Sequence, residues 1–478
     1  MKLKELLQGI ETKNEIRINP EITNISDSTA KIRSGGAFIC ICGSKSDGHS
    51  FAPKAIETGA EVIICERDIG IENCVIVKDT RKAYALMCSN FCENSHRKMK
   101  MIGITGTNGK TSTSFILKKI LENAGHKVGL IGTVSVIIGS ETHPAELTTP
   151  DPADLHKFFK MMYEAGCDTC IMEVSSQALV QQRVCGITFD CGIFTNLSPE
   201  HLDYHKTMEN YAQAKAKLFG ECKSAVLNAD DEYSEVMKAA CSGKIVEFSA
   251  KKKSDVSAEN VELSTEGVRY ILETPEEKYN VDISLMGGFS VYNSMAALSA
   301  AYLMGEDIGT AVGAIKEIDG VEGRMEKVPN KLGINVIIDF AHTPDSLENA
   351  LKTVRSVYSG RLLTVFGCGG DRDKTKRPLM GRIACEYSDT VYITSDNSRT
   401  EDPEAIIDDI IRGIDKENYF RITDRTQALK SAIFAAKQGE TVLIAGKGHE
   451  KYQIIGKQKT YYNEREIVRN ILEEKARL

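Results

Sequence analysis

The sequence predicts an α/β protein of three domains, each built around a mainly parallel sheet. Apolar runs rich in Val and Ile alternate with amphipathic stretches, as at 61–66, 100–107, 170–176, 362–370, 389–396 and 440–448. Such alternation is typical of β-α units, in which each strand is followed by a helix that covers the sheet. The chain has 478 residues, a length that fits about three domains of ordinary size.

The composition excludes several classes of protein. Charged residues make up 27% and hydrophobic residues 42% of the chain, as in ordinary globular proteins. A net charge of −7 argues against a general nucleic-acid-binding protein. No window holds the roughly 18 near-continuous apolar residues of a membrane span, and the N-terminus lacks the apolar run of a secretory signal. We therefore expect a cytoplasmic monomer that acts on small molecules.

The chain contains 14 cysteines, which we expect to be reduced thiols in a cytoplasmic protein. Cys167 and Cys170 form a single C-x-x-C, with no second pair elsewhere. Because a structural zinc site needs four ligands, buried thiols beside a strand are the favoured interpretation.

Two polar stretches indicate domain boundaries. The first is the basic segment 94–100, which precedes the strand that enters a glycine-rich loop; the second is the loop around Pro329 and Asn330. The predicted domains are therefore 1–97, 98–327 and 328–478, all of ordinary domain size.

The glycine-rich loop I-T-G-T-N-G-K-T-S-T occupies 104–113. The standard phosphate loop, G-x4-G-K-[ST], fails here because Ile104 stands at the position of its first glycine. A shorter loop, G-x-x-G-K-T, remains from Gly106 to Thr111. Its glycines would let backbone amides approach phosphate oxygens, Lys110 would reach the terminal phosphates, and the Thr111 hydroxyl would bind Mg²⁺. A β-α turn with an incidental lysine is the alternative, but the order of strand, loop and helix favours phosphate binding.

Two further groups are candidate metal ligands. Glu173 ends the next buried strand and could hold Mg²⁺, although a lone strand-end Glu is more often solvated. His201 and His205 are four residues apart, as in a zinc-binding helix. However, Leu202 occupies the position of the Glu in H-E-x-x-H, and no third ligand is evident. The alternative is that His201 joins Glu173 at the Mg²⁺ site.

The short loop resembles the ATP-binding loop of the Mur ligases and of folylpolyglutamate synthetase, enzymes that form amide bonds through an acyl phosphate. The stretch 196–219 is similar to the central domain of the Mur ligases. Further segments follow in the family's order, and several are similar to its MurE branch: 26–66, 147–152, 175–183, 287–301, and then G-G-D-R-D-K-T-K-R-P, S-D-N-S-R-T-E-D-P and G-K-G-H-E. The resemblance runs from about residue 20 to 455, and so many ordered matches identify the chain as a member of the family.

The resemblance implies the fold and the role of each domain. A Rossmann-like domain, 1–97, would bind a UDP-muramoyl peptide; a central domain of the P-loop ATPase type, 98–327, would bind ATP; and a Rossmann-like domain, 328–478, would bind an amino acid. The implied reaction is ATP-dependent addition of meso-2,6-diaminopimelate to UDP-N-acetylmuramoyl-L-alanyl-D-glutamate in peptidoglycan precursor synthesis.

The resemblance also implies the residues around the two nucleotides. For ATP they are Gly106, Thr107, Asn108, Gly109, Lys110, Thr111, Ser112, Asn293, Arg324, Asp339 and His342. For the UDP-muramoyl peptide they are Ser28, Thr148, Thr149, Ser175, Gln181 and Arg183. The chain reads Asp27-Ser28-Thr29 where the family usually has D-S-R, so one substrate contact is missing.

In the family, the lysine that matches Lys215 is carbamylated, which converts a cation into a carboxylate-like metal ligand. The implied catalytic residues are Lys110, Glu173, His201 and carbamylated Lys215. Two Mg²⁺ ions would be held by Thr111, Glu173, His201 and Lys215. From the residues alone, a solvated helix charge is the alternative for Lys215.

The amino-acid pocket implied by the resemblance consists of Arg372, Asp396, Asn397, Arg399, Gly446 and Glu450. Diaminopimelate-adding members typically carry D-N-P-R, whereas this chain has Ser398 in place of the Pro. An Arg fork can bind the distal carboxylate of diaminopimelate, which lysine lacks. The alternative for Arg399 is a surface pair with Glu401 or Asp402.

Other functions remain open at the level of sequence. The runner-up activities are an L-lysine-adding MurE-type ligase, another Mur ligase and a folylpolyglutamate synthetase-like enzyme; the last would have no use for the segment 20–66. A non-catalytic nucleotide-binding regulator is a different class, but the intact Lys110, Glu173, His201 and Lys215 argue against it.

Overall fold

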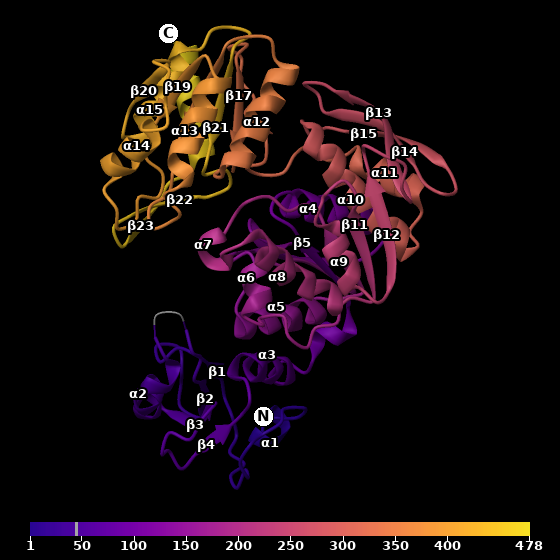
Figure 1. Cartoon of the computed structure of the whole chain (residues 1–478), viewed down its shortest axis with the longest axis vertical. Helices are drawn as coiled ribbons and strands as arrows, with labels where there is room; N and C mark the ends of the chain where they lie inside the picture. The colour runs from indigo at the N-terminus through magenta and orange to yellow at the C-terminus, as the bar shows by residue number, and fades with distance from the viewer. Residues whose placement is uncertain (44–45) are drawn as a thin grey trace.

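The computed structural model describes residues 1–43 and 46–478. These residues form three helix-covered sheets and a separate two-stranded hairpin, which confirms the predicted α/β architecture. Figure 1 shows the chain passing from the N-terminal sheet through the large central domain to the C-terminal sheet.

The N-terminal sheet has four parallel strands in the order β1-β2-β3-β4. Their bounds are Ile25–Ser26, Gly36–Ile39, Ala60–Cys65 and Cys74–Ile76. The helices are α1 (Leu3–Leu6), η1 (Gly48–Phe51), α2 (Ala52–Thr58) and α3 (Thr80–Phe91), and η2 (Ser95–Lys98) leads into the next domain.

The central sheet has eleven strands in the order β15-β14-β13-β12-β11-β10-β5-β9-β6-β7-β8. The middle strands, from β13 to β6, are parallel, and antiparallel strands extend both edges. The strands are β5 (Lys100–Thr105), β6 (Val128–Ile131), β7 (Ser135–Ile138), β8 (Glu141–Pro144), β9 (Thr169–Glu173), β10 (Cys191–Phe194), β11 (Ser224–Asn228), β12 (Lys244–Ser249), β13 (Val256–Leu263), β14 (Val268–Glu273) and β15 (Lys278–Ile283). The helices are α4 (Lys110–Asn123), α5 (Pro152–Glu164), α6 (Ser176–Val180), α7 (Leu202–His205), α8 (Met208–Gly220), α9 (Ser234–Ala240), α10 (Gly288–Met304) and α11 (Ile308–Ile315).

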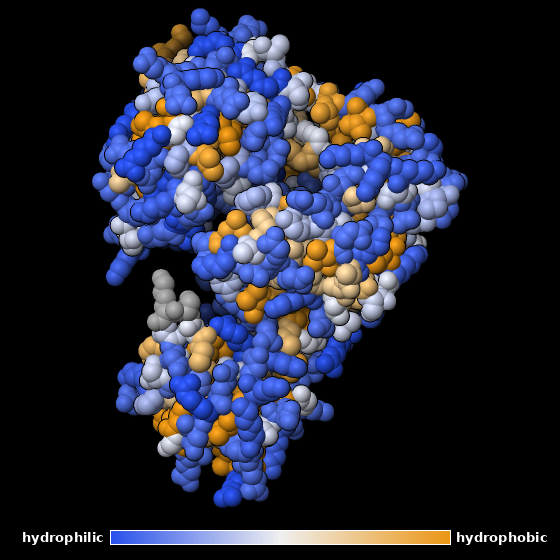
Figure 2. All heavy atoms as spheres, viewed as in Figure 1, coloured by the Kyte–Doolittle hydropathy of each residue, from blue (hydrophilic) through white to orange (hydrophobic). Residues whose placement is uncertain are grey.

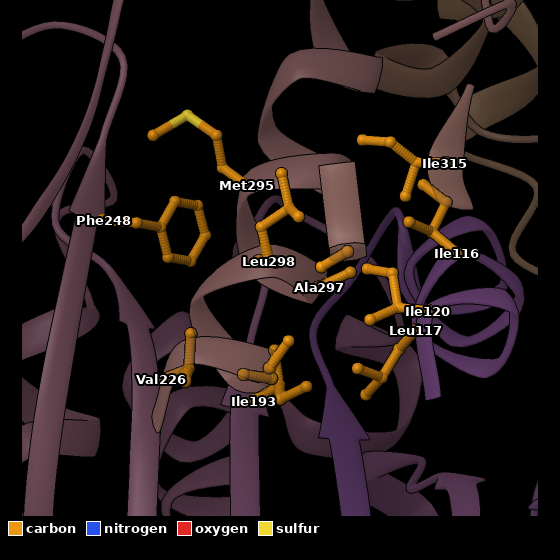
Figure 3. Packing of buried hydrophobic residues seen from close by; sticks show 14 of the residues in the cluster. Ile116, Leu117, Ile120, Ile193, Val226, Phe248, Met295, Ala297, Leu298 and Ile315 are labelled. Carbon is orange, nitrogen blue, oxygen red and sulfur yellow. The ribbon is translucent and has the colours of Figure 1, made fainter. Parts of the chain in front are cut away.

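The central sheet is covered on both faces, as a parallel sheet requires. On one face, α4 packs against α10 and α11 through Ile116, Leu117, Met295, Leu298 and Ile315 (Figure 3). On the other face, α5 and α8 cover the sheet with Phe159 and Phe219 among the buried residues. Because α4 packs beside α10 on the same face of the sheet, the core fixes the position of its first residue, Lys110.

The C-terminal sheet has the order β16-β17-β21-β18-β19-β20, with only β16 antiparallel. Its strands are β16 (Glu326–Lys327), β17 (Asn335–Asp339), β18 (Leu362–Phe366), β19 (Thr390–Ile393), β20 (Tyr419–Arg421) and β21 (Thr441–Ala445). The helices are α12 (Pro344–Val357), α13 (Lys376–Tyr387), α14 (Pro403–Ile411), α15 (Arg425–Ala435) and α16 (Glu464–Ala476), and β22 (Tyr452–Ile455) pairs with β23 (Gln458–Tyr461) in a separate hairpin.

The sheets fall within the three predicted ranges except at one end. Strand β16 lies before the expected boundary at 327, yet it pairs with β17 of the third sheet. The break between the second and third sheets therefore lies between β15 and β16.

The cysteines are free thiols, and Cys167 and Cys170 are buried at β9 as expected. Within 1–43 and 46–478, no helix is both long enough and apolar enough to cross a membrane.

Candidate active site

The phosphate loop joins the end of β5 to the start of α4, as the sequence predicts. Gly106 and Gly109 have φ of 151° and 86°, in the region that favours glycine. A Cβ on Gly106 would lie 1.9 Å from Thr195 Oγ1, and one on Gly109 would lie 2.3 Å from Asn293 Oδ1. The loop is therefore packed too tightly for side chains at either glycine, and it lies against Asn293 of α10.

Lys110 folds back over its own loop. Its Nζ donates to the carbonyl oxygens of Gly106 and Thr107 at 2.9 and 2.8 Å. Burial lowers the pKa of Lys110, while the carboxylates of Glu173 and Glu200 act to raise it. The ammonium is thus held at the point where the terminal phosphates of a nucleotide on this loop would lie.

Lys215, on α8, is 1% exposed, which excludes the solvated helix charge. Its Nζ also donates to Gly106 O, at 2.9 Å, and lies 4.5 Å from the centre of the Tyr211 ring. Burial, together with the nearby charge of Lys110, lowers the pKa of Lys215 well below its ordinary value. The lowered pKa favours the neutral form of the Lys215 amine, and a neutral amine is a nucleophile.

Glu173 ends β9 directly beside the phosphate-loop strand, since Glu173 pairs in register with Ile104. The residue is 0% exposed, and its two carboxylate oxygens accept from Thr133 N at 3.1 Å and Thr133 Oγ1 at 2.8 Å. Among the residues described, it makes no ion pair. Buried carboxylates are usually paired with a cation or bound to a metal, so Glu173 is a candidate metal ligand.

Glu200 was not among the residues predicted from the sequence. Its Oε1 lies 3.7 Å from His201 Nε2 and 3.5 Å from Nε2 of His342, a residue of the C-terminal domain. Burial raises the pKa of Glu200, but contact with His342 and the charges of His201 and Lys110 outweigh it and hold the pKa well below the usual range. A signal existed in the sequence: Glu200 follows β10, the neighbour of β5, at the same edge of the sheet.

The two histidines of H-x-x-x-H have different partners. His201 faces Glu200, whereas His205 Nε2 contacts Ser176 Oγ at 2.9 Å and its ring stacks on Tyr211. Because His201 and His205 face different partners, the structure does not support the zinc interpretation.

A cavity of about 170 Å³ joins the phosphate loop to the residues predicted for the nucleotide sugar. Its lining includes Gly106, Lys110, Thr148, Thr149, Ser175, Arg183, Glu200, His201, Tyr211 and Lys215. Gln181 does not line it but accepts from Arg183 Nε at 3.0 Å, and Arg183 Nη1 donates to Thr149 O at 2.7 Å. Ser28 lies apart, in a turn of the N-terminal domain where its N–H donates to Ser26 Oγ.

Residues at the junction of the central and C-terminal domains reach the phosphate loop. Arg324 Nη2 donates to Thr111 Oγ1 at 3.2 Å, and its guanidinium lies 4.7 Å from the Phe340 ring centre. Asp339 accepts from the backbone N–H groups of Met325 and Ala341. Burial raises the pKa of Asp339, and the Arg324 charge opposes this shift.

The predicted amino-acid residues gather at the end of the C-terminal sheet. Arg399 Nη1 donates to Gly370 O at 2.8 Å, and Arg372 Nη1 donates to Asp371 O at 3.0 Å. Burial and the neighbouring Arg399 charge lower the pKa of Arg372. Across 1–43 and 46–478, neither guanidinium makes an ion pair. The alternative interpretation, in which Arg399 pairs with Glu401 or Asp402, is therefore wrong.

Glu401 instead accepts from Arg377 at 2.9 Å and pairs with Lys374 at 3.0 Å. Two adjacent guanidinium groups that form no ion pair among the described residues make a site suited to an anion. Asn397 Nδ2 donates to Glu450 Oε2 at 2.8 Å beside them, and a Cβ on Gly446 would lie 2.9 Å from Asp396 Oδ2.

A second cluster, in the N-terminal domain, consists of residue types that bind metals, but both ring nitrogens of its histidine form hydrogen bonds. Ligand atoms of Cys42, Asp47 and His49 lie within 4.8 Å of one another. His49 Nε2 accepts from the backbone N–H of Glu66 at 3.1 Å, so the ring proton is on Nδ1, 2.6 Å from Asp47 Oδ1. The cluster is therefore a hydrogen-bond network.

Comparison with known proteins finds relatives along the whole chain. Family models match in chain order: the Mur ligase family catalytic domain at 21–97, the Mur ligase middle domain at 104–301, and the Mur ligase glutamate ligase domain at 323–448. Proteins named UDP-N-acetylmuramoyl-L-alanyl-D-glutamate--2,6-diaminopimelate ligase are similar over the whole chain. The one from Clostridium botulinum is 42% identical, covering 99% of this chain and 100% of its own, and the one from Clostridioides difficile is 45% identical, covering 99% of both.

Solved structures are similar over the same length. The structure of a UDP-N-acetylmuramoyl-L-alanyl-D-glutamate--2,6-diaminopimelate ligase has a TM-score of 0.72 and 32% identity, covering 100% of this chain and 99% of its own. A MurF ligase from Thermotoga maritima in complex with ADP, 18% identical with a TM-score of 0.64, covers 95% of this chain and 98% of its own and shares the fold. With relatives this similar from end to end, the chain belongs to the Mur ligase family.

Proposed function

We propose that the protein is an ATP-dependent ligase that joins meso-2,6-diaminopimelate to UDP-N-acetylmuramoyl-L-alanyl-D-glutamate, a step of peptidoglycan precursor synthesis. Full-length relatives at 42–45% identity carry the name of that activity. One observation carries the choice of amino acid: Arg399 and Arg372 lie together near Glu450, and neither forms an ion pair with a described residue. Because ATP and UDP-linked precursors are cytoplasmic metabolites, we assign the reaction to the cytoplasm.

The acyl-phosphate chemistry that the family resemblance implies fits the groups that line the cavity. A carboxylate must be activated before an amine can displace its oxygen, and transfer of the ATP γ-phosphoryl group yields an acyl phosphate with a good leaving group. Lys110 would hold the transferring phosphoryl group and reduce the repulsion between two anions. The amine then attacks the acyl carbon, a tetrahedral intermediate forms and phosphate leaves.

The donor set beside the phosphate loop fits Mg²⁺. Thr111, Glu173 and a carbamate on Lys215 would offer oxygen donors, and His201 a nitrogen; oxygen is the donor that Mg²⁺ prefers. The buried carboxylate of Glu173, whose only donor among the described residues is Thr133, supports this assignment. Bound Mg²⁺ would neutralise charge that develops on the phosphoryl oxygens.

The lowered pKa of Lys215 supports its carbamylation. Only a neutral amine adds to carbon dioxide, with release of a proton and formation of a carbamate anion. Burial and the charge of Lys110 favour the neutral amine at this position. Once formed, the anion would be stabilised by the charges that disfavour the ammonium.

A ligation assay tests the function. The purified protein is incubated with ATP, Mg²⁺, UDP-N-acetylmuramoyl-L-alanyl-D-glutamate and one amino acid from a panel. The product is identified by mass spectrometry and ADP release is measured in parallel. We expect product with meso-diaminopimelate and little with L-lysine. Preferred use of L-lysine would overturn the amino-acid assignment, and no turnover with any amino acid would overturn the ligase.

A further inference from the structure

The segment that follows β21, Gly446-Lys447-Gly448, buries a lysine that none of the roles above assigns. Lys447 is 0% exposed. Gly446 and Gly448 have φ of 115° and 53°, and a Cβ on Gly448 would lie 2.7 Å from Phe340 Cβ. The two glycines thus let the backbone turn tightly against its neighbours while the lysine side chain points inward.

The Lys447 ammonium lies among the polar groups of the amino-acid pocket. Its Nζ is 3.2 Å from Asn397 Oδ1, 3.4 Å from Glu450 Oε2 and 3.8 Å from Asp396 Oδ1. The rings of Tyr452 and Tyr462 lie within 6 Å on the remaining sides. A fully buried ammonium is retained only where such partners replace water.

We propose that Lys447 is a positioning residue that sets the orientation of Asn397 and Glu450 toward the distal ammonium of the amino-acid substrate. This inference rests on the proposed function and takes Glu450, as the carboxylate of the amino-acid pocket, to face that ammonium.

The Asn397 amide is the first link in this arrangement. Its Oδ1 accepts from Lys447 Nζ and from the backbone N–H of Ile454 at 2.9 Å. Its Nδ2 donates to Glu450 Oε2 at 2.8 Å. A flipped amide would direct its N–H groups at two donors and its oxygen at a carboxylate, so Lys447 and Ile454 together permit only one orientation.

The Glu450 carboxylate is the second link. Its Oε2 receives Asn397 Nδ2 and Lys447 Nζ, and its Oε1 accepts from Tyr452 OH at 3.2 Å. The lysine also offsets the repulsion between Glu450 and Asp396. Burial raises the pKa of Asp396, but the charges of Lys447 and Arg425 outweigh it and keep the pKa below its ordinary value. Without Lys447, two carboxylates would share the pocket with less compensating charge.

The test compares two amino acids that differ only at the distal carbon. Meso-diaminopimelate has a distal ammonium and carboxylate, whereas L-2-aminopimelate has only the carboxylate. Lys447→Met removes the charge and nearly keeps the volume. We expect its KM for diaminopimelate to rise on the order of 10- to 100-fold, with the KM values for ATP and the UDP-linked substrate unchanged. The preference for diaminopimelate over aminopimelate should fall by a similar factor.

Two further variants keep the proposal falsifiable. Lys447→Gln retains one N–H donor for Asn397 Oδ1 without the charge, so its KM should lie between those of the wild type and Lys447→Met; it decides the question if the Met variant does not fold. Lys475→Met is the matched control. Lys475 donates to the carbonyls of Ile433 and Phe434 at the end of α15 and contacts no residue of the pocket.

The proposal is overturned if the wild-type preference for diaminopimelate over aminopimelate survives in both Lys447 variants. It is also overturned if all three KM values rise together, because a merely structural role would do that. Failure of the proposed function is separate: it appears as wild-type use of another amino acid, and the Lys447 variants must then raise the KM for that amino acid.

Discussion

Lys110 and Lys215 donate to the same carbonyl oxygen, that of Gly106, and this shared acceptor ties two cations to one turn of backbone. Lys215 is buried, so it is not the solvated helix charge that was the alternative from the sequence. Burial lowers the pKa of both amines, and the charge of Lys110 lowers that of Lys215 further. In the proposed reaction, Lys110 would supply the cation for phosphate and Lys215 the amine for modification.

Lys215→Ala should lower kcat by about 100- to 1,000-fold, since it removes a buried group beside the reacting phosphate. Formate or acetate should restore part of the activity by occupying the space of the lost carbamate. The measurement is ligation rate against carboxylate concentration. Full activity of this variant at low carbonate would contradict the carbamate, and Lys217→Ala, an exposed lysine on the same helix, is the control.

Glu200→Gln should lower kcat by about 10- to 100-fold while preserving the fold, because the amide keeps the shape but not the charge that faces His201, His342 and Lys110. Steady-state kinetics and a thermal melt separate the two effects. An unchanged kcat would show that Glu200 serves only to join the domains.

Arg399→Ala should reduce kcat/KM for meso-diaminopimelate by about 100-fold and leave the low value for L-lysine nearly unchanged. The backbone of Arg399 has a φ of 52°, a conformation that is equally strained for Ala and for Arg. The variant therefore reports the loss of the guanidinium alone. Arg382→Ala, at an exposed residue of α13, is the control. Equal or better use of L-lysine by the unmodified protein would show the assignment to be wrong.

Among the helices, strands and loops, the sequence predicted those whose pattern lies in consecutive residues. The strand, loop and helix around Lys110 could be predicted because an apolar run, two glycines and a lysine follow one another. The position of Glu173 was also predictable, since a strand parallel to β5 brings its carboxyl end to the same edge. Glu200 follows a strand beside β5, which hints at its place but not at its role. The roles of Glu200 and Lys447 depend on His342 and on Asn397, which lie 142 and 50 residues away in the chain and are brought close only by tertiary packing.

The boundary at β16 was missed for a similar reason. This two-residue strand has no apolar pattern of its own, and only its pairing with β17 assigns it to the third sheet. By contrast, the antiparallel strands β13 to β15 belong to the predicted central range, although the β-α pattern gave no reason to expect them at its edge.

The packing of η2 on α5, at the junction of the first two domains, buries two histidines. His96 and His156 have ring centres 5.3 Å apart, and none of their ring nitrogens has a partner among the residues described. Burial lowers the pKa of His96 to about 4 and that of His156, where the charge of His96 contributes further, to about 3. Both are therefore neutral in the folded protein near pH 7.

This junction should weaken in acid. The folded-state pKa values lie below the unfolded value of 6.5, so the stability is fully present above pH 6.5 and falls as pH decreases toward 4. Each histidine should lower the free energy of unfolding by about 2 kcal/mol as the pH falls from 8 to 5. His156→Leu should remove the part of this loss of stability that His156 causes. The measurement compares the unfolding free energies of the variant and the wild type at the two pH values. An identical pH dependence in both proteins would refute this explanation.

For the whole molecule, the central and C-terminal domains meet across the phosphate loop. Figure 2 shows a hollow between the N-terminal and C-terminal domains, next to the part of the central domain that carries α7 in Figure 1. Asn108 Nδ2 donates to Asp345 Oδ2 at 2.8 Å, and Ser198 Oγ donates to the same oxygen at 3.1 Å. Because Asn108 belongs to the loop and Asp345 to the first turn of α12, these bonds connect the nucleotide site to the position of the amino-acid domain.

Asp345→Ala should therefore favour an open arrangement of the ligand-free protein. Two hydrogen bonds to a partly exposed carboxylate are worth about 1–2 kcal/mol together, which would change the closed-to-open ratio roughly 10-fold. Small-angle X-ray scattering should show a larger radius of gyration for the variant, and added ATP should reduce the difference, because nucleotide contacts from both domains favour closure. Asn349→Ala is the matched control, since Asn349 donates to the other oxygen of Asp345 from within α12 and crosses no domain boundary. If Asp345→Ala and Asn349→Ala scatter like the wild type, the contact between Asn108 and Asp345 does not hold the domains together.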